Sequence, residues 1–487
     1  MKKYISGALA ASVMLCCLIS CGESVSGNPT EDTAAGNATE AAESTGIYDV
    51  LQDNNYNGYE FRVLNNLSNV AYVNIGEKGL TGETLDDAMY NRNLRVAEKL
   101  NINFNIENRE YQDTYDTISK LVMSGDDVYD MYTLDLSWMR QHALNRYLFN
   151  TADIKSLDIN NPWWDKNAIE SVTVCDYYYA LLGALHVGYY DTFYPAVFNK
   201  NMVENLGLDD PYQLVRDGKW TLDMMIDMMM SVKQDLDGDG KWTENDRYPF
   251  SMYQDNASIC LLSTSNVELF PRNENNLPVW KGLPERYVET YEKLADTMFS
   301  EKTNNANNCS GNVTKSDLAK HRAMMHIGET LFMFEPLGAV KDLRDVDFAL
   351  GIAPLPKYDE SQKDYRTYIF AAANAIAIPV TNPDPERTGV ILEHMAAYSR
   401  ETVRNVFFNE TLDYKYAQDI EGQEMLDIMF SGGFFELGSV YGWGGVVKEM
   451  MNQLKEGKKE IVSKIEAISN KAISDLETAV EAFNDLK

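Results

Sequence analysis

The sequence predicts an α/β protein with two lobes, and two kinds of observation support this. Residues 59–64 alternate as a strand does, residues 85–100 place apolar side chains at approximately helical spacing, and residues 102–106 alternate again. A strand, a helix and a strand form a unit that requires a right-handed crossover where the strands are parallel neighbours. The second observation is length, because about 440 residues follow position 46, which is too many for one ordinary domain.

Each element has its own pattern. The first strand, YEFRVL, ends in two polar asparagines, and the helix that follows places Met89, Leu94, Val96 and Leu100 on its apolar face. The pattern then repeats, with a helix over 114–123, an extended segment over 127–134 and a helix over 138–147. In such a fold, ligands are expected beyond the carboxyl ends of the strands.

The N-terminus has the pattern of a lipoprotein leader. Lys2 and Lys3 precede an apolar run, residues 5–18, which is shorter than the roughly 20 residues that span a bilayer. The sequence LISC, ending at Cys21, resembles a bacterial lipobox. It implies that a signal peptide, 1–20, is removed and that lipid, palmitate included, anchors Cys21 to the extracytoplasmic face of the cell membrane. The alternative is an ordinary secretory leader with a chance cysteine.

Composition limits the partners and the disulfides. Residues 21–46 contain no aromatic side chain and are read as a lipidated cysteine followed by a flexible linker. The net charge of −31 repels nucleic acid, so no nucleic-acid partner is expected. Outside the leader and Cys21, three cysteines remain, and an odd number cannot all pair within one chain. The sequence leaves their redox state open, with buried free thiols expected for at least two of Cys175, Cys260 and Cys309.

Six stretches of the chain carry a family resemblance through their joint order. They are residues 82–105, 160–168 (NNPWWDKNA), 178–214, 218–229 (GKWTLDMMIDMM), 348–365 (FALGIAPLPKYDESQKDY) and 376–399. Together they resemble the extracellular solute-binding lipoproteins of ABC importers, the two-lobed family that includes maltose-binding protein, in particular a branch from anaerobic Gram-positive bacteria. The resemblance implies a periplasmic-binding-protein-like fold of type II, in which a monomer captures an oligosaccharide and delivers it to a membrane permease.

The same resemblance implies discontinuous lobes joined by hinge strands. Lobe one would comprise 47–188 plus 372–414, and lobe two 189–371 plus 415–487. The hinge strands would lie near 185–196 and 370–377, and closure about them around a ligand would be the working motion.

One acidic loop has the spacing of a calcium site. Asp235, Asp237 and Asp239 occupy positions 1, 3 and 5, a glycine follows, the Lys241 carbonyl is at position 7, and Asp246 is at position 12. An aspartate instead of glutamate at position 12 resembles the calcium loops of dockerins and indicates weaker binding. The sequence therefore predicts a structural calcium ion, with a solvated acidic turn as the alternative.

Aromatic and polar residues supply the candidate ligand contacts. Sugars present apolar faces that stack on Trp or Tyr, and hydroxyl rims that bond to carboxylates and amides. The Tyr441 to Trp443 stretch resembles the aromatic stretch with which maltose-binding protein closes on sugar, and Glu335 resembles a cleft-lining position. The predicted contacts are Asp135, Trp138, Trp164, Asp191, Glu335, Tyr441 and Trp443, and the alternative for each is packing in the core.

No catalytic motif is recognisable. The chain lacks GxSxG, HExxH, GxGxxG and a phosphate-binding GxxxxGK[ST], and its five histidines show no ligand spacing. Carboxylates are so abundant that a glycosidase pair could always be found, so such a pair is no evidence. We expect a binding protein and not an enzyme. Peptides or other polar solutes are the alternative ligands, and an exported polysaccharide-active enzyme or a structural lipoprotein is the alternative class.

Overall fold

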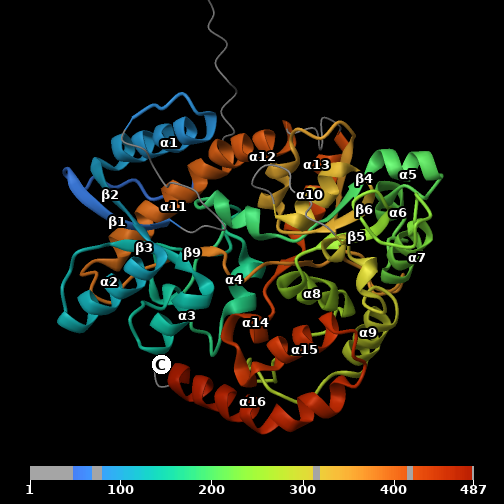
Figure 1. Ribbon diagram of the computed structural model, residues 1–487. Coiled ribbons are helices and arrows are strands. Elements are labelled where there is room, and N and C mark those ends of the chain that lie inside the picture. Colours follow the sequence, from blue (N-terminus) through green and yellow to red (C-terminus); the bar gives the residue numbers. More distant parts are fainter. Residues whose placement is uncertain (1–47, 68–78, 311–318, 414–419, 485–487) are drawn as a thin grey trace, which may run out of the picture. The chain divides into compact units, whose positions relative to one another are not determined.

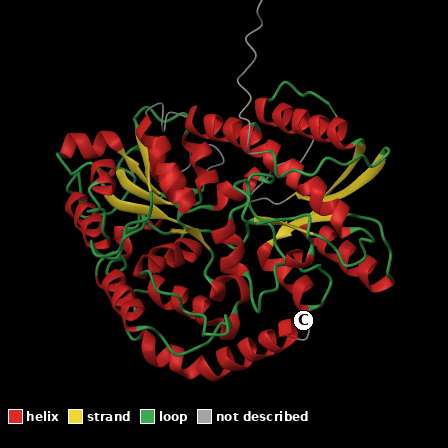
Figure 2. Cartoon of the chain, turned by 180° about the vertical axis from the view of Figure 1, so that it is seen from behind, coloured by secondary structure: helices red, strands yellow, loops and turns green. Residues whose placement is uncertain are grey.

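The computed structural model describes residues 48–67, 79–310, 319–413 and 420–484 (Figure 1). The predicted signal peptide, Cys21 and the linker lie outside the described residues. The chain divides into two units, 1–49 and 50–487, and every helix and strand given below belongs to the second. Figure 2 shows that the strands gather in two separate groups with helices around them.

The first sheet contains the predicted strand, helix and strand unit. Its order is β2-β1-β3-β9, in which β1 is parallel to both β2 and β3, and β9 is antiparallel to β3. The bounds are β1 Tyr59–Leu67, β2 Ile102–Glu110, β3 Met131–Asp135 and β9 Asn374–Ala377. Parallel pairing of β1 and β2, with Tyr59 opposite Ile102, confirms that the two predicted strands are neighbours.

The second sheet has the order β5-β6-β4-β7. Strands β5 and β6 are parallel, and β4 is antiparallel to both β6 and β7. The bounds are β4 Ala196–Asn199, β5 Tyr248–Met252, β6 Thr330–Phe334 and β7 Leu350–Ala353. A pair of two-residue strands, β8 Thr367–Tyr368 and β10 Gly433–Phe434, completes the strand set of the described residues.

Sixteen α-helices surround the sheets within the described residues. In the first half of the chain they are α1 Thr84–Leu100, α2 Tyr111–Ser124, α3 Leu136–Leu144, α4 Lys166–Val172, α5 Lys200–Leu206, α6 Pro211–Arg216, α7 Leu222–Val232 and α8 Gln254–Leu262. The others are α9 Glu285–Asp296, α10 Lys320–Ile327, α11 Pro385–Glu401, α12 Val403–Asp413, α13 Ile420–Ser431, α14 Leu437–Tyr441, α15 Val446–Lys455 and α16 Ile461–Asn484. None of these helices is long and apolar enough to cross a membrane.

Helix α1 differs from its predicted face. Leu94 is 45 % exposed, so its assignment to the apolar face was wrong, whereas Arg92 is buried. The guanidinium of Arg92 donates to Ser399 Oγ at 2.6 Å, which makes its burial tolerable. The buried side chains of α1 thus follow the packing against α11 and not polarity alone.

Two segments join the sheets, residues 192–195 and 367–373, and we call them the crossing segments. The Phe370 amide donates to the Thr192 carbonyl, and the Tyr194 amide donates to the Tyr368 carbonyl, both at 3.0 Å. The continuous hinge strand expected over 185–196 is wrong, because Val187–Thr192 forms a 3-10 helix, η2. Of the second expected hinge strand, only β9 is extended as a strand.

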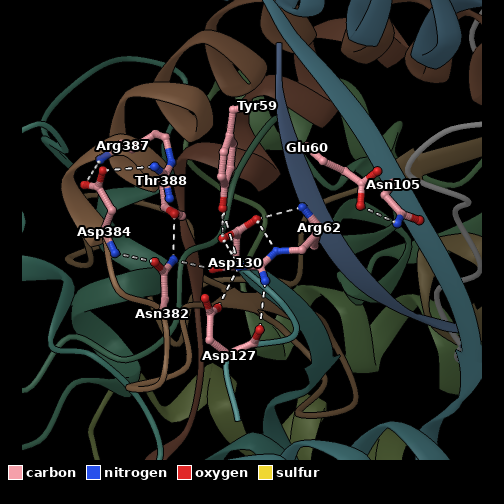
Figure 3. A network of polar contacts seen from close by, with 10 residues as sticks. All are labelled: Tyr59, Glu60, Arg62, Asn105, Asp127, Asp130, Asn382, Asp384, Arg387 and Thr388. Carbon is pink, nitrogen blue, oxygen red and sulfur yellow. Dashed lines mark hydrogen bonds and ion pairs between the residues drawn. The ribbon is translucent and has the colours of Figure 1, made fainter. Parts of the chain in front are cut away.

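A buried polar network ties the first sheet together at the amino ends of its parallel strands, β1, β2 and β3 (Figure 3). Asp130 is fully buried and accepts from the Tyr59 hydroxyl at 2.7 Å and from Arg62 Nη2 at 2.8 Å. Arg62 Nη2 also contacts the more exposed Asp127 at 2.6 Å. The Arg387 guanidinium lies 3.6 Å from the centre of the Tyr59 ring. The network therefore fixes β1 to the loop before β3 and to the start of α11, at the edge opposite the carboxyl ends.

Candidate functional site

A cavity of about 520 Å³ adjoins the second crossing segment. This volume lies within the range of about 300–1,000 Å³ that is usual for small-molecule sites. Its walls come from that segment, from α14, from the turn between α14 and α15, from α15 and from α8. The lining residues are Ile259, Tyr368, Phe370, Ala371, Gly438, Ser439, Gly442, Gly445, Val447, Lys448, Met451, Asn452 and Lys455.

Helix α3, at the carboxyl end of β3, braces this cavity. The amides of Leu136 and Ser137 donate to the carbonyls of Ala373 and Ala371, at 3.0 and 3.1 Å. One turn later, Arg140 Nη1 donates to the Val440 carbonyl of α14. The cavity therefore lies beside a carboxyl end of the first sheet, where the fold class predicts a ligand.

The predicted aromatic stretch contributes its backbone to the cavity. Gly442 lines the cavity, but the rings of Tyr441 and Trp443 on either side of it are buried and stack on each other at 4.7 Å between centroids. The Tyr441 hydroxyl donates to the Val172 carbonyl at 3.0 Å, and the Trp443 ring meets Phe270 edge-on. Neither ring is among the lining residues, so sugar contact by Tyr441 and Trp443 stays a prediction.

Asp135 and Trp138 lie at the carboxyl end of β3. Asp135 is buried and accepts from Asn66 Nδ2 at 3.4 Å. Trp138 is half-buried in α3, with its ring 5.5 Å from that of Tyr111 and 5.3 Å from that of Tyr115. Both residues thus lie at or in helix α3, which packs behind the cavity wall, and neither is among the lining residues.

Glu335 follows β6, at a carboxyl end of the second sheet. It is buried, with its two oxygens 3.0 Å from His321 Nε2 and 3.1 Å from Arg322 Nη2. Burial opposes ionisation, but the contacts with His321 and Arg322 together hold the pKa of Glu335 below its usual value. After burial itself, the Glu335 charge is the next largest factor that raises the pKa of Tyr194, whose ring lies 5.7 Å from that of Tyr368 in the cavity wall. Neither Glu335 nor Tyr194 is among the lining residues of the cavity.

Asp191 and Trp164 each form a hydrogen bond with another side chain of the protein. Asp191 is buried and accepts from Lys341 Nζ at 2.8 Å, and burial raises its pKa. Trp164 donates its indole N–H to Glu393 at 2.9 Å, beside Trp163, which does the same at 2.6 Å. Burial raises the pKa of Glu393 even though it accepts from both indoles.

Sequence reasoning missed most of the cavity wall. Phe370 lies within a predicted hinge strand, and an aromatic residue at that position could have been proposed as part of a ligand site. Lys448 and Asn452 on α15 carry no signal in the sequence, because a lysine and an asparagine four residues apart are ordinary on an exposed helix face. Their role depends on where α15 packs.

The acidic loop brings three of its predicted ligands together. Asp235, Asp237 and Asp239 each place a carboxylate oxygen within 4.8 Å of the others. Asp246 is fully buried, and its oxygens accept from the amides of Leu236 at 3.0 Å and Thr243 at 2.7 Å. The first three carboxylates fit a hard cation, whereas Asp246 closes the loop through its backbone partners. Cys175, Cys260 and Cys309 are all buried, and none of the three forms a disulfide in the described part of the chain.

The fold is that of the two-lobed substrate-binding proteins of ABC transporters, which confirms the predicted fold class. The sequence itself matches no protein-family model and no curated protein. Among solved structures, a cyclo/maltodextrin-binding protein complexed with maltotetraose is 13 % identical, with a TM-score of 0.54 over 88 % of this chain and 96 % of that one.

Two further structures have the same fold. UspC of M. tuberculosis is 12 % identical, with a TM-score of 0.56 over 85 % of this chain and all of that one. An ABC substrate-binding protein from Listeria monocytogenes in complex with cycloalternan is 13 % identical, with a TM-score of 0.51 over 86 % of this chain and 99 % of that one.

Proposed function

We propose that this chain is the solute-binding component of an ABC importer and that it captures an oligosaccharide for delivery to a membrane permease. The observation that carries the proposal is the cavity beside the crossing segments, in a fold whose solved examples include complexes with maltotetraose and cycloalternan. An aromatic ring, that of Phe370, and polar groups of α15 line that cavity together, and such a mixture suits a sugar.

The mechanism requires no covalent step. A ligand that contacts both lobes stabilises the arrangement in which those contacts exist, and so shifts the population toward it. The lining belongs to predicted lobe two, and α3 of predicted lobe one braces it, so closure would change the access to the cavity. Acylation of Cys21 would hold the protein, as a monomer, on the extracytoplasmic face of the membrane near its permease.

The test is thermal unfolding of the full chain, purified in mild detergent, with pools of mono-, di- and oligosaccharides and of peptides. A ligand at about 100 times its Kd stabilises the native state by about 2.7 kcal/mol. At about 2.1 cal/mol/K per residue, that is a rise in Tm of about 3 °C for this chain. A rise with sugars that are recovered intact supports the proposal.

The alternative functions give different results. A rise with peptides alone would favour a peptide-binding protein, and sugars recovered in fragments would favour an exported polysaccharide-active enzyme. A chain that responds to neither pool would fit a structural lipoprotein and would contradict the proposal.

We further propose that the acidic loop binds calcium as a structural clip. The carboxylates of Asp235, Asp237 and Asp239, with the Lys241 carbonyl, would hold the ion, and Asp246 would orient the loop. Calcium should raise Tm relative to chelator, and the Asp237→Asn, Asp239→Asn double variant should lose that rise. Asp223→Asn, an exposed aspartate of α7, should keep it. Equal Tm values with calcium and chelator would refute the site.

A further inference from the structure

The cavity has the opposite charge to the rest of the molecule. The chain has 74 acidic and 43 basic residues, apart from histidine, yet the charged side chains in the cavity lining are Lys448 and Lys455. No aspartate or glutamate is among the described lining residues. In a chain of net charge −31, a wall of this composition is a local exception.

A third cation lies directly behind the wall. A Cβ built on Gly442, which lines the cavity, would be 3.7 Å from Arg140 Nη1. Arg140 is half-buried, burial lowers its pKa, and its Nη1 donates to the Val440 carbonyl. The ion pairs of the described residues include none with Arg140 or with Lys448.

Three carboxylates of the neighbouring segments, at the start of α14, in α15 and in α16, have partners of their own. Glu436 is buried and accepts from the amide of Gly438 at 3.3 Å as the N-cap of α14. Glu449 accepts from Gln453 on α15, and Asp475 of α16 accepts from Lys471 and from the Gly444 amide. None of the three is in the cavity lining.

We infer that the ligand of this cavity is an anionic oligosaccharide, whose carboxylate or sulfate groups face Lys448 and Lys455, with the Arg140 guanidinium behind the wall. This inference rests on the proposed function and names its substrate class. Low-dielectric walls lined by one sign of charge focus the field and raise the local concentration of the opposite ion. The half-buried ring of Phe370 offers a face for the sugar ring.

The experiment is calorimetric titration of the full chain in detergent with three trisaccharides: a uronic acid oligomer, a sulfated oligomer and a neutral glucan. Acidic peptides of the same charge form a fourth arm. The uronic and sulfated arms separate the two sources of negative charge. We expect at least one anionic trisaccharide to bind about tenfold or more tightly than the neutral one. Raising NaCl from 50 to 500 mM should weaken that binding several-fold, because screening acts only on the charged ligand.

Three variants locate the effect. Lys448→Met should weaken binding of the anionic trisaccharide about three- to tenfold and leave binding of the neutral one unchanged, whereas Lys448→Arg should retain the affinity. Lys464→Met, at an exposed position of α16 outside the cavity, is the matched control. Tm values of all three should equal that of the parent, because Lys448 is exposed.

Each possible result supports or overturns the inference. Preference for an anionic trisaccharide together with the loss in Lys448→Met supports the inference. Binding of the neutral glucan as tightly as the anionic ones, or an unaltered Lys448→Met, would overturn it and leave the proposed function standing. Binding of acidic peptides without any sugar, or no binding at all, would overturn both.

Discussion

Replacement of Asp130 by asparagine should destabilise the protein strongly, although the two side chains have nearly the same shape. Asp130 is fully buried and receives four hydrogen bonds, from the Tyr59 hydroxyl and from the backbone N–H, Nε and Nη2 of Arg62 (Figure 3). An amide has one acceptor oxygen, so it must point an NH₂ group at one of these donors. The Arg62 guanidinium also loses its buried counter-charge.

The magnitude follows from the burial of the pair. Breaking a buried ion pair by removing one partner costs about 3–5 kcal/mol. Arg62 keeps Asp127 at 2.6 Å and its side chain is 21 % exposed, so the cost belongs at the low end, about 3 kcal/mol. At about 2.1 cal/mol/K per residue, that is a fall in Tm of about 3 °C.

The chain contains its own control. Asp127 pairs with the same guanidinium, but its side chain is 38 % exposed, and exposed pairs contribute about 0–1 kcal/mol. Asp127→Asn should therefore lower Tm by less than about 1 °C. Urea unfolding followed by circular dichroism measures the free energy of unfolding of both variants. Equal losses in Asp130→Asn and Asp127→Asn would refute the argument from burial.

Three further predictions concern backbone space and titration. Gly183→Ala should cost at least about 2 kcal/mol in urea unfolding, because φ is +146° and the new Cβ would be 2.5 Å from the Trp163 carbonyl oxygen; a variant as stable as the parent would contradict this. Burial raises the pKa of Glu436 to about 7, so between about pH 4.5 and 7 the folded state keeps a proton that the unfolded state has released. The free energy of unfolding therefore falls by about 3 kcal/mol as pH rises through this range. Glu436→Gln should remove that loss, and identical pH profiles would count against it. Burial lowers the pKa of His142 to about 4, so its contribution is complete above about 6.5 and is lost as pH falls toward 4. Urea midpoints at a series of pH values should show His142→Gln losing less stability over that range, and a parallel loss would exclude His142 as the cause.

Local patterns predicted three of the four strands of the first sheet, β1, β2 and β3, because strand alternation is a property of adjacent residues. The helix predicted over 114–123 is found as α2, and the strand predicted to start at residue 127 begins at Met131. Residues 127–130 form the loop that holds Arg62 instead. The 3-10 helix η2 could not be predicted, since its neighbour in the structure, the second crossing segment, is about 180 residues away in sequence.

Residue type predicted which side chains could bind a sugar but not where they point. Tyr441 has the right chemistry, yet its hydroxyl is bonded to Val172 in the interior. Asp191 is paired with Lys341. Conversely, Lys448 gains its significance only from the position of α15 beside the second crossing segment. Sequence patterns therefore predicted the architecture. The walls of the cavity could not be predicted, because they depend on contacts between segments that are distant in sequence.

Native mass spectrometry of the full chain, released from detergent after incubation with a mixed oligosaccharide pool, can show directly whether the chain captures an oligosaccharide. We expect one oligosaccharide bound per chain, with a mass that matches an intact member of the pool. The absence of any sugar adduct, or the appearance of shortened sugars in the pool, would contradict it.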